Sequence, residues 1–171
     1  MAFMSVDSLK ANLTNPQRTF NWELLIPVPI GGGDSNLFTI RAQSSQVPSR
    51  ENSPINVPFK QTAGAVFAGK LTYTHTWECS FVEGEDHKIY DAIHDWQEDI
   101  VGENTGIGLG DPLYKTDAYI TQLTTAGGNS LRLKLKGIWP QNIAVLPLSY
   151  ENNTVAIYTV TFAFDSFEKA D

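Results

Sequence analysis

The chain has 171 residues, of which 42% are hydrophobic and 18% charged, a balance typical of one globular domain rather than of a disordered chain. We therefore expect a single domain over residues 1–171. The formal net charge of −7 argues against general nucleic-acid binding, which needs cations to neutralise phosphates. No apolar run approaches the ~20 residues that cross a bilayer, so no membrane insertion is expected.

Extended segments dominate the first third of the chain, after a short helix predicted over residues 5–13. The alternation of polar and apolar side chains over 18–27 predicts a strand, and residues 37–43 predict a second one. Residues 46–68 contain three prolines, which restrict a strand to a sheet edge or a projecting ribbon. We interpret 46–68 as a projecting loop or hairpin, and connections of this length are usually functional.

Residues 69–82 alternate strictly, which predicts one long strand. The polar face carries Lys70, Thr72, Thr74, Thr76, Glu78 and Ser80, and the apolar face carries Leu71, Tyr73, His75, Trp77, Cys79 and Phe81. Cys79 is the single cysteine, so an internal disulfide is excluded and a buried, inert thiol is expected. Such a strand suits a sheet that forms a surface better than one that surrounds an active site.

Residues 85–101 give the one convincing helix, because Ile89, Ile93, Trp96 and Ile100 form a single apolar stripe. The surrounding segment 83–103 holds Glu83, Glu85, Asp86, Asp91, Asp95, Glu98, Asp99 and Glu103. These 8 acids against Lys88 alone give −7, so the rest of the chain is neutral. The helix therefore presents either a solvated acidic face or a docking surface for a basic partner.

The remaining strands are expected at 117–124, at 130–138, between Pro140 and Pro147, and at 154–164. In the second of these, Arg132, Lys134 and Lys136 alternate with leucines, which indicates either a solvated face or a contact with an acidic partner. Seven or eight strands with one long helix predict a mainly β (α+β) fold, with antiparallel sheets in a sandwich or a barrel-like arrangement.

Catalytic and cofactor motifs find no support. His87, Asp91 and His94 share one side of the helix, but the neighbouring acids favour a solvated or partner-facing surface over a metal site. The glycines of 106–110 follow a helix instead of preceding one, which is the reverse of a phosphate-binding loop. We expect no metal, no cofactor and no enzymatic activity.

Four segments, taken in their order along the chain, allow a comparison with a known protein family. They are the opening NPQRTFNWELLIP, the proline-rich 46–68, the strand GKLTYTHTW, and the closing GIWPQNIAVLPLSYENNTVAIYTVTFAFDSFE. An acidic turn and a helix bearing Trp96 lie between the last two. Over about residues 15–168 this order resembles the tail tube proteins of contractile-tailed bacteriophages, although Trp139 stands where phenylalanine is commoner.

The resemblance implies two antiparallel sheets curled into a barrel-like sandwich with one helix outside. It also implies a structural virion protein, assembled in the host cytoplasm, whose hexameric rings stack into a hollow tail tube. DNA would pass through the lumen without specific binding. Tail sheath, baseplate and tail terminator proteins are the expected partners.

Two surfaces follow from this resemblance. The acidic helix would face the sheath with Glu85, Asp91, Asp95, Glu98 and Asp99. The projecting segment would reach an adjacent subunit or ring as an arm that carries Arg50, Ile55, Val57 and Phe59. Two strand faces are candidates for lining the lumen, the threonine face of 72–76 and the basic face of 132–136, and the resemblance does not choose between them.

Two other functions stay open at this point. The first is the inner tube of a type VI secretion system or another contractile injection system, which shares the fold. The second is a small, monomeric, ligand-binding β-barrel, which would need a concave aromatic patch.

Overall fold

Strands make up most of the regular structure. The computed structural model describes residues 5–13, 15–29, 36–60, 62–111, 113–151 and 153–170. The helices are α1 (Val6–Asn12), α2 (Leu37–Arg41) and α3 (Lys88–Ile100). The strands are β1 (Trp22–Leu25), β2 (Ala42–Ser45), β3 (Arg50–Phe59), β4 (Thr62–Tyr73), β5 (Thr76–Val82), β6 (Thr116–Leu123), β7 (Asn129–Ile143), β8 (Ile157–Ala163) and β9 (Ser166–Ala170). The predicted mainly β class with one long helix is confirmed.

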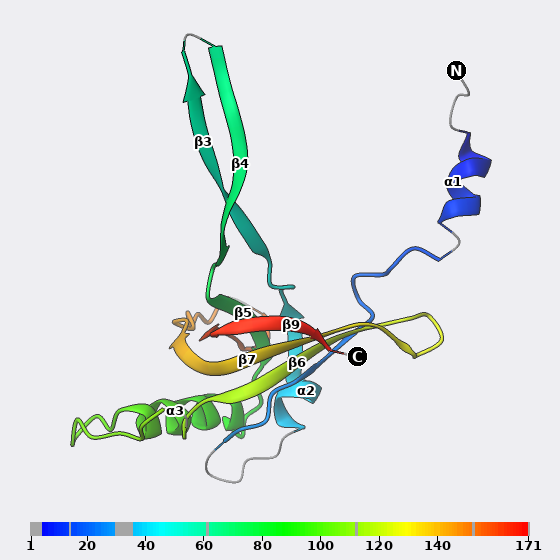
Figure 1. Ribbon diagram of the computed structural model, residues 1–171. Helices are drawn as coiled ribbons and strands as arrows, with labels where there is room; N and C mark the ends of the chain where they lie inside the picture. The colour runs from blue at the N-terminus through cyan, green and yellow to red at the C-terminus, as the bar shows by residue number, and fades with distance from the viewer. Residues whose placement is uncertain are drawn as a thin grey trace.

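Seven strands form one antiparallel sheet in the order β1-β6-β7-β8-β5-β2, with β9 also paired to β7 (Figure 1). The first part of β7 pairs with β6 and β9, whereas its last residues, 139–143, pair with β8. Side chains from both halves meet in one core, so the sheet folds over into a sandwich. The predicted sandwich of antiparallel strands is confirmed, and because β1 and β2 stay at opposite ends of this order, the described strands do not close into a barrel.

The sheet bends at Gly137, the point where β7 passes from one half to the other. Gly137 has φ +64°, and the place of a Cβ atom is taken by the carboxylate of Asp165. The amide of Asp165 donates to the carbonyl of Lys136 at 3.0 Å, which holds the β8–β9 corner against β7. Only glycine combines that backbone conformation with so close a neighbour.

The core lies between the two halves and is closed on one side by α3. Trp77 and Phe81 of β5, Phe162 of β8 and Leu135 of β7 are all buried. The helix adds Ile89, Ile93 and Trp96, which are also buried. Cys79 is a buried free thiol, as expected, and burial raises its pKa. No described helix is long and apolar enough to span a membrane.

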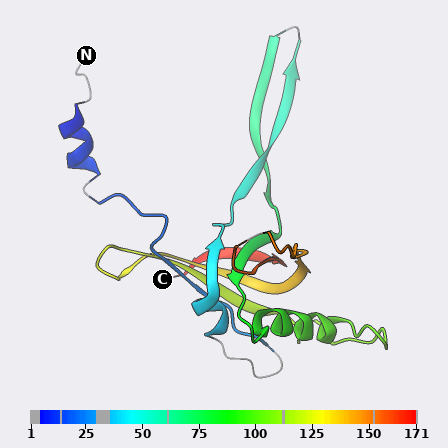
Figure 2. The same cartoon turned by 180° about the vertical axis from the view of Figure 1, so that it is seen from behind.

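Strands β3 and β4 form a separate two-stranded ribbon that projects from the sandwich (Figures 1 and 2). The prediction of one continuous strand over 69–82 is wrong, because the chain breaks between β4 and β5. His75 adopts the left-handed conformation there, with φ 54°. Its carbonyl accepts from the amide of Phe164 at 3.1 Å, and its Nδ1 donates to the Phe164 carbonyl at 3.0 Å. Thr72, Thr74 and Thr76 therefore do not form one face.

Three further predictions of strands need correction. Residues 37–43 begin as α2 and become strand only at β2, because Phe38 turns inward to pack edge-on against Phe81 at 5.2 Å between ring centres. The strand predicted over 18–27 is confined to β1. Pro140 does not start a new strand: it lies inside β7, and residues 144–149 are neither helix nor strand.

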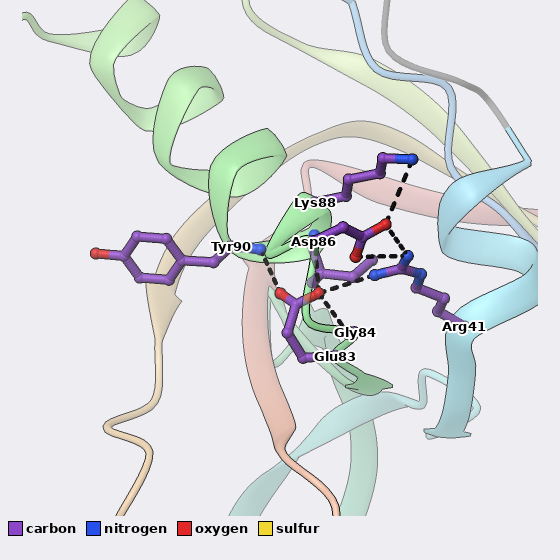
Figure 3. A network of polar contacts seen from close by, with 7 residues as sticks. Arg41, Glu83, Gly84, Asp86, Lys88 and Tyr90 are labelled. Carbon is purple, nitrogen blue, oxygen red and sulfur yellow. Dashed lines mark hydrogen bonds and ion pairs between the residues drawn. The ribbon is translucent and has the colours of Figure 1, made fainter.

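A buried carboxylate fixes the start of α3 (Figure 3). Glu83 follows β5, is 8% exposed, and accepts hydrogen bonds from the amides of Gly84 (3.0 Å), Ile89 (3.3 Å) and Tyr90 (2.8 Å). Arg41 of α2 donates to Glu83 at 2.9 Å and to Asp86 at 2.7 and 2.8 Å. The cluster thus joins α2, β5 and α3, and the helix begins at Lys88 instead of at residue 85 as predicted.

Replacing Glu83 by alanine is expected to lower the free energy of unfolding by about 3 kcal/mol, because the buried amides and Arg41 lose their acceptor. Urea denaturation followed by circular dichroism measures this. Glu85→Ala is the matched control, since Glu85 is exposed two residues away and its loss should change the free energy by less than about 0.5 kcal/mol. Equal effects of the two variants would contradict the anchoring role of Glu83.

A second prediction concerns pH. Hydrogen bonds from Arg41 lower the pKa of Asp86 from 3.8 to about 2. A carboxyl whose pKa is lower in the folded chain stabilises it above the unfolded value, and this contribution is lost as pH falls from about 4 to 2. Asp86→Asn should therefore flatten the fall of the urea midpoint over that range. Asp91→Asn, which removes an exposed acid from the first turn of α3, is the matched charge control.

Candidate interaction surfaces

The acidic side chains of α3 form a band on the solvent side of the helix. Asp91, Asp95 and Glu98 are exposed and spaced i, i+4 and i+7, opposite the buried stripe. Asp99 is half-buried beside them, and Glu85 is exposed in the turn before the helix. We call these five residues the acidic band. The residues predicted to face a sheath thus lie on α3 and in the turn before it, and four of the five are exposed.

Local pairing makes the acidic segment less negative than its composition indicates. Glu83 is inside the protein and Asp86 is paired with Arg41 and Lys88, so neither belongs to the acidic band. Glu98 accepts from the amide of Glu103 at 2.9 Å, which ties the end of α3 to the following loop. No group of three potential metal ligands occurs among the described residues.

One face of the ribbon carries four exposed apolar side chains. Ile55, Val57 and Phe59 alternate along β3 and are 51%, 47% and 63% exposed, while Phe67 of β4 stands opposite Ile55 and is 58% exposed. We call these four residues the apolar ribbon face. Arg50 lies at the base of the ribbon opposite Tyr73. It is an odd number of residues away from Ile55 along β3, so its side chain lies on the other face of the strand. The predicted arm residues therefore divide between the two faces.

The basic alternation of β7 lies on the outer face of the sheet but is compensated there. Lys134 pairs with Asp117 at 2.9 Å, and Lys136 pairs with Glu168 at 2.7 Å. The Arg132 guanidinium lies over the Tyr119 ring, 4.6 Å from its centre. Burial acts to raise the pKa of Asp117, but hydrogen bonds from Lys134 and the Gly137 amide outweigh it and the pKa is lowered. This face is therefore no free basic patch.

The outer face of β5 and β8 is rich in hydroxyl groups. The hydroxyls of Ser80 and Thr159 are 2.9 Å apart, and Thr161 stands opposite Glu78 in the same pair of strands. Sequence alternation indicated the hydroxyls of β5. It gave no register against β8, so it could not show that the two strands build this face together.

Two exposed apolar segments were missed from the sequence. Val6, Leu9 and Leu13 form a stripe on and just after α1 and are 67%, 61% and 52% exposed. Their spacing of i, i+3 and i+7 was the signal that could have identified the stripe. In the connection between β7 and β8, Val145 and Leu148 are 93% and 87% exposed.

Comparisons with known proteins agree on one family. The family model described as phage tail tube protein matches residues 18–170. The tail tube protein gp19 of Enterobacteria phage T4 is 29% identical over 134 residues, which cover 77% of this chain and 81% of that protein. The corresponding protein of Enterobacteria phage T6 is 28% identical over the same length.

Solved structures share the fold at low sequence identity. A chain in the sheath-tube complex of an extracellular contractile injection system in the extended state has a TM-score of 0.63 and 14% identity, with 98% of this chain and 99% of that chain covered. A chain of the anti-feeding prophage tube terminating cap has a TM-score of 0.64 and 15% identity, with 91% and 92% covered. Since the family model spans nearly the whole described sandwich and ribbon, the chain belongs to the phage tail tube protein family and is a structural component of the virion tail.

Proposed function

We propose that this chain is the repeating subunit of the inner tube of a contractile phage tail, in which hexameric rings stack around a lumen that passes DNA. The apolar ribbon face carries the proposal. A two-stranded ribbon alone is marginally stable in water, and this one exposes six large apolar side chains, the four of the apolar ribbon face together with Val66 and Leu71. A neighbouring subunit or ring that covers the ribbon supplies the missing contacts.

Assembly by repetition suits the shape of the chain. The ribbon projects away from the sandwich, so its partner surface must lie elsewhere on a second copy (Figure 1). Such a head-to-tail contact closes into a ring when the rotation closes and otherwise continues along an axis. Arg50, Ile55, Val57 and Phe59 then act as the arm between subunits or rings.

The acidic band fits the role of a contact with the sheath. Its members Asp91, Asp95 and Glu98 are exposed and lie on the side of α3 that faces away from the core. An electrostatic contact of this kind is weakened by salt and easily reversed, as a sheath that slides past its tube requires. Baseplate and tail terminator proteins would meet the two ends of the stack.

The alternative functions have less support. A type VI or other contractile injection tube shares the fold, but the family model and the T4 and T6 relatives favour a phage tail. A monomeric ligand-binding barrel would need a deep aromatic pocket. The hollow of about 490 Å³ beside β1 is lined by two aromatic residues, Phe20 and Trp22, but Phe20 is 70% exposed, so this hollow is not a deep aromatic pocket. A structural role without enzymatic activity is the better fit.

Electron microscopy of the purified protein tests the proposal. Negatively stained samples at increasing concentration should show rings or hollow tubes of uniform diameter with six-fold end views. Val57→Asp, which places a charge on the apolar ribbon face, should raise the concentration needed for assembly at least ten-fold. Asn56→Asp, on the opposite face of the same strand, should change it little. Small monomeric particles at every concentration, with and without a baseplate nucleus, would contradict a tube subunit.

The contact with the sheath has its own test. Neutralising Asp91, Asp95 and Glu98 together should leave tubes intact but weaken co-sedimentation with the sheath protein of the same tail about ten-fold at low salt. Glu23, Glu78 and Glu151, neutralised together, change the net charge equally outside α3 and serve as the control. Loss of binding in the control as large as in the band variant would show that overall charge, not α3, governs the contact.

A further inference from the structure

Helix α1 is too short to be stable alone, yet its sequence specifies a helix. It has seven residues, whereas isolated helices below about 12 residues are marginal in water. Ser5 caps it by accepting from the amide of Ser8 at 3.2 Å. None of its residues is buried, and Val6, Leu9 and Leu13 form an exposed apolar stripe. The helix therefore needs a surface on which to dock.

The ribbon, like α1, needs a partner surface, because it exposes an apolar face and a two-stranded ribbon is only marginally stable by itself. The sizes of the two surfaces agree. The stripe from Val6 to Leu13 is about 10 Å long at 1.5 Å per residue. The apolar ribbon face from Ile55 to Phe59 is about 13 Å long at 3.3 Å per residue. A helix laid on a sheet face is one of the ordinary packed layers of proteins.

The two elements do not meet within one chain. Figures 1 and 2 show that both project to the same side of the sandwich but from opposite flanks, with α1 level with the ribbon. Residues 15–21, which contain neither helix nor strand, lead from the helix to β1 at the flank away from the ribbon. A second copy placed beside the first by rotation brings its ribbon to the flank that carries α1.

We propose that α1 of one copy docks its stripe of Val6, Leu9 and Leu13 on the apolar ribbon face of a neighbouring copy. The contact rests on the proposed tube function and names the partner segment for the ribbon. It covers both marginal elements at once. Because each copy gives a helix on one flank and receives one on the other, the contact repeats around a ring.

Disulfide cross-linking of the assembled full-length chain tests this contact. Leu9 lies at the centre of the stripe and Val57 at the centre of the ribbon face, so Leu9→Cys with Val57→Cys reports on docking in either helix orientation. The native Cys79 is buried, and its raised pKa keeps it out of exchange. Mild oxidation should give a ladder of covalent oligomers on a non-reducing gel. Mixed single variants should give dimers only.

Two matched controls use the opposite faces. Ala11→Cys with Val57→Cys moves the thiol to the other side of α1, and Leu9→Cys with Asn56→Cys moves it to the other face of β3. Both pairs should cross-link at least ten-fold less than Leu9 with Val57. Should the first pair fail to fold, Leu9→Cys with Phe67→Cys probes the same contact, since Phe67 stands opposite Ile55 on that face.

The outcomes separate this inference from the proposed function. Intact tubes in which neither central pair cross-links above its controls would overturn the docking of α1 and leave the tube function standing. A cross-link within single chains would overturn it as well. Parent protein that forms neither rings nor tubes would instead count against the tube function itself.

Discussion

The buried carboxylate of Glu83 is the interaction on which the rest of the structure depends. Three backbone amides and Arg41 converge on it, so α2, the end of β5 and the start of α3 are held at one point. Because α3 closes the core, its orientation decides whether Trp96 and its neighbours are covered. The same anchor places a negative group at the positive end of the helix dipole. It also turns the acidic band toward solvent.

The protein divides into a self-sufficient part and a dependent part. The sandwich carries the aromatic and aliphatic core, the compensated charges of β7 and the corner at Gly137, all of which are formed within one chain. The ribbon and α1 expose apolar surface that the sandwich does not cover. In the proposed tube, contacts with neighbouring subunits would therefore add stability to the ribbon and to α1.

Local patterns in the sequence predicted the elements but not the breaks between them. The stripe of α3 and the alternation of β5, β7 and β8 follow from burial on one face, which repeats at a fixed period. At His75 one left-handed residue moves the chain from the ribbon to the sandwich while the alternation continues, so the pattern carries no trace of the turn. The arm and acidic-band residues could be chosen for their exposure. The charges that are compensated within the fold could not be identified in this way, because the pairs Lys134 with Asp117 and Arg41 with Glu83 depend on strand register and tertiary contact.

Proline placement in β3 has a consequence for the chain before it assembles. Pro54 and Pro58 are four residues apart, so their backbone groups point to the same side of the strand, and neither has an amide hydrogen to donate. They fit an antiparallel pair only where the backbone points away from β4, so every second outward-pointing donor is missing from the outer edge of β3. An added strand would find an interrupted ladder there. Strand addition to the ribbon is therefore disfavoured along β3 and is left to the outer edge of β4, whose residues 62–73 contain no proline.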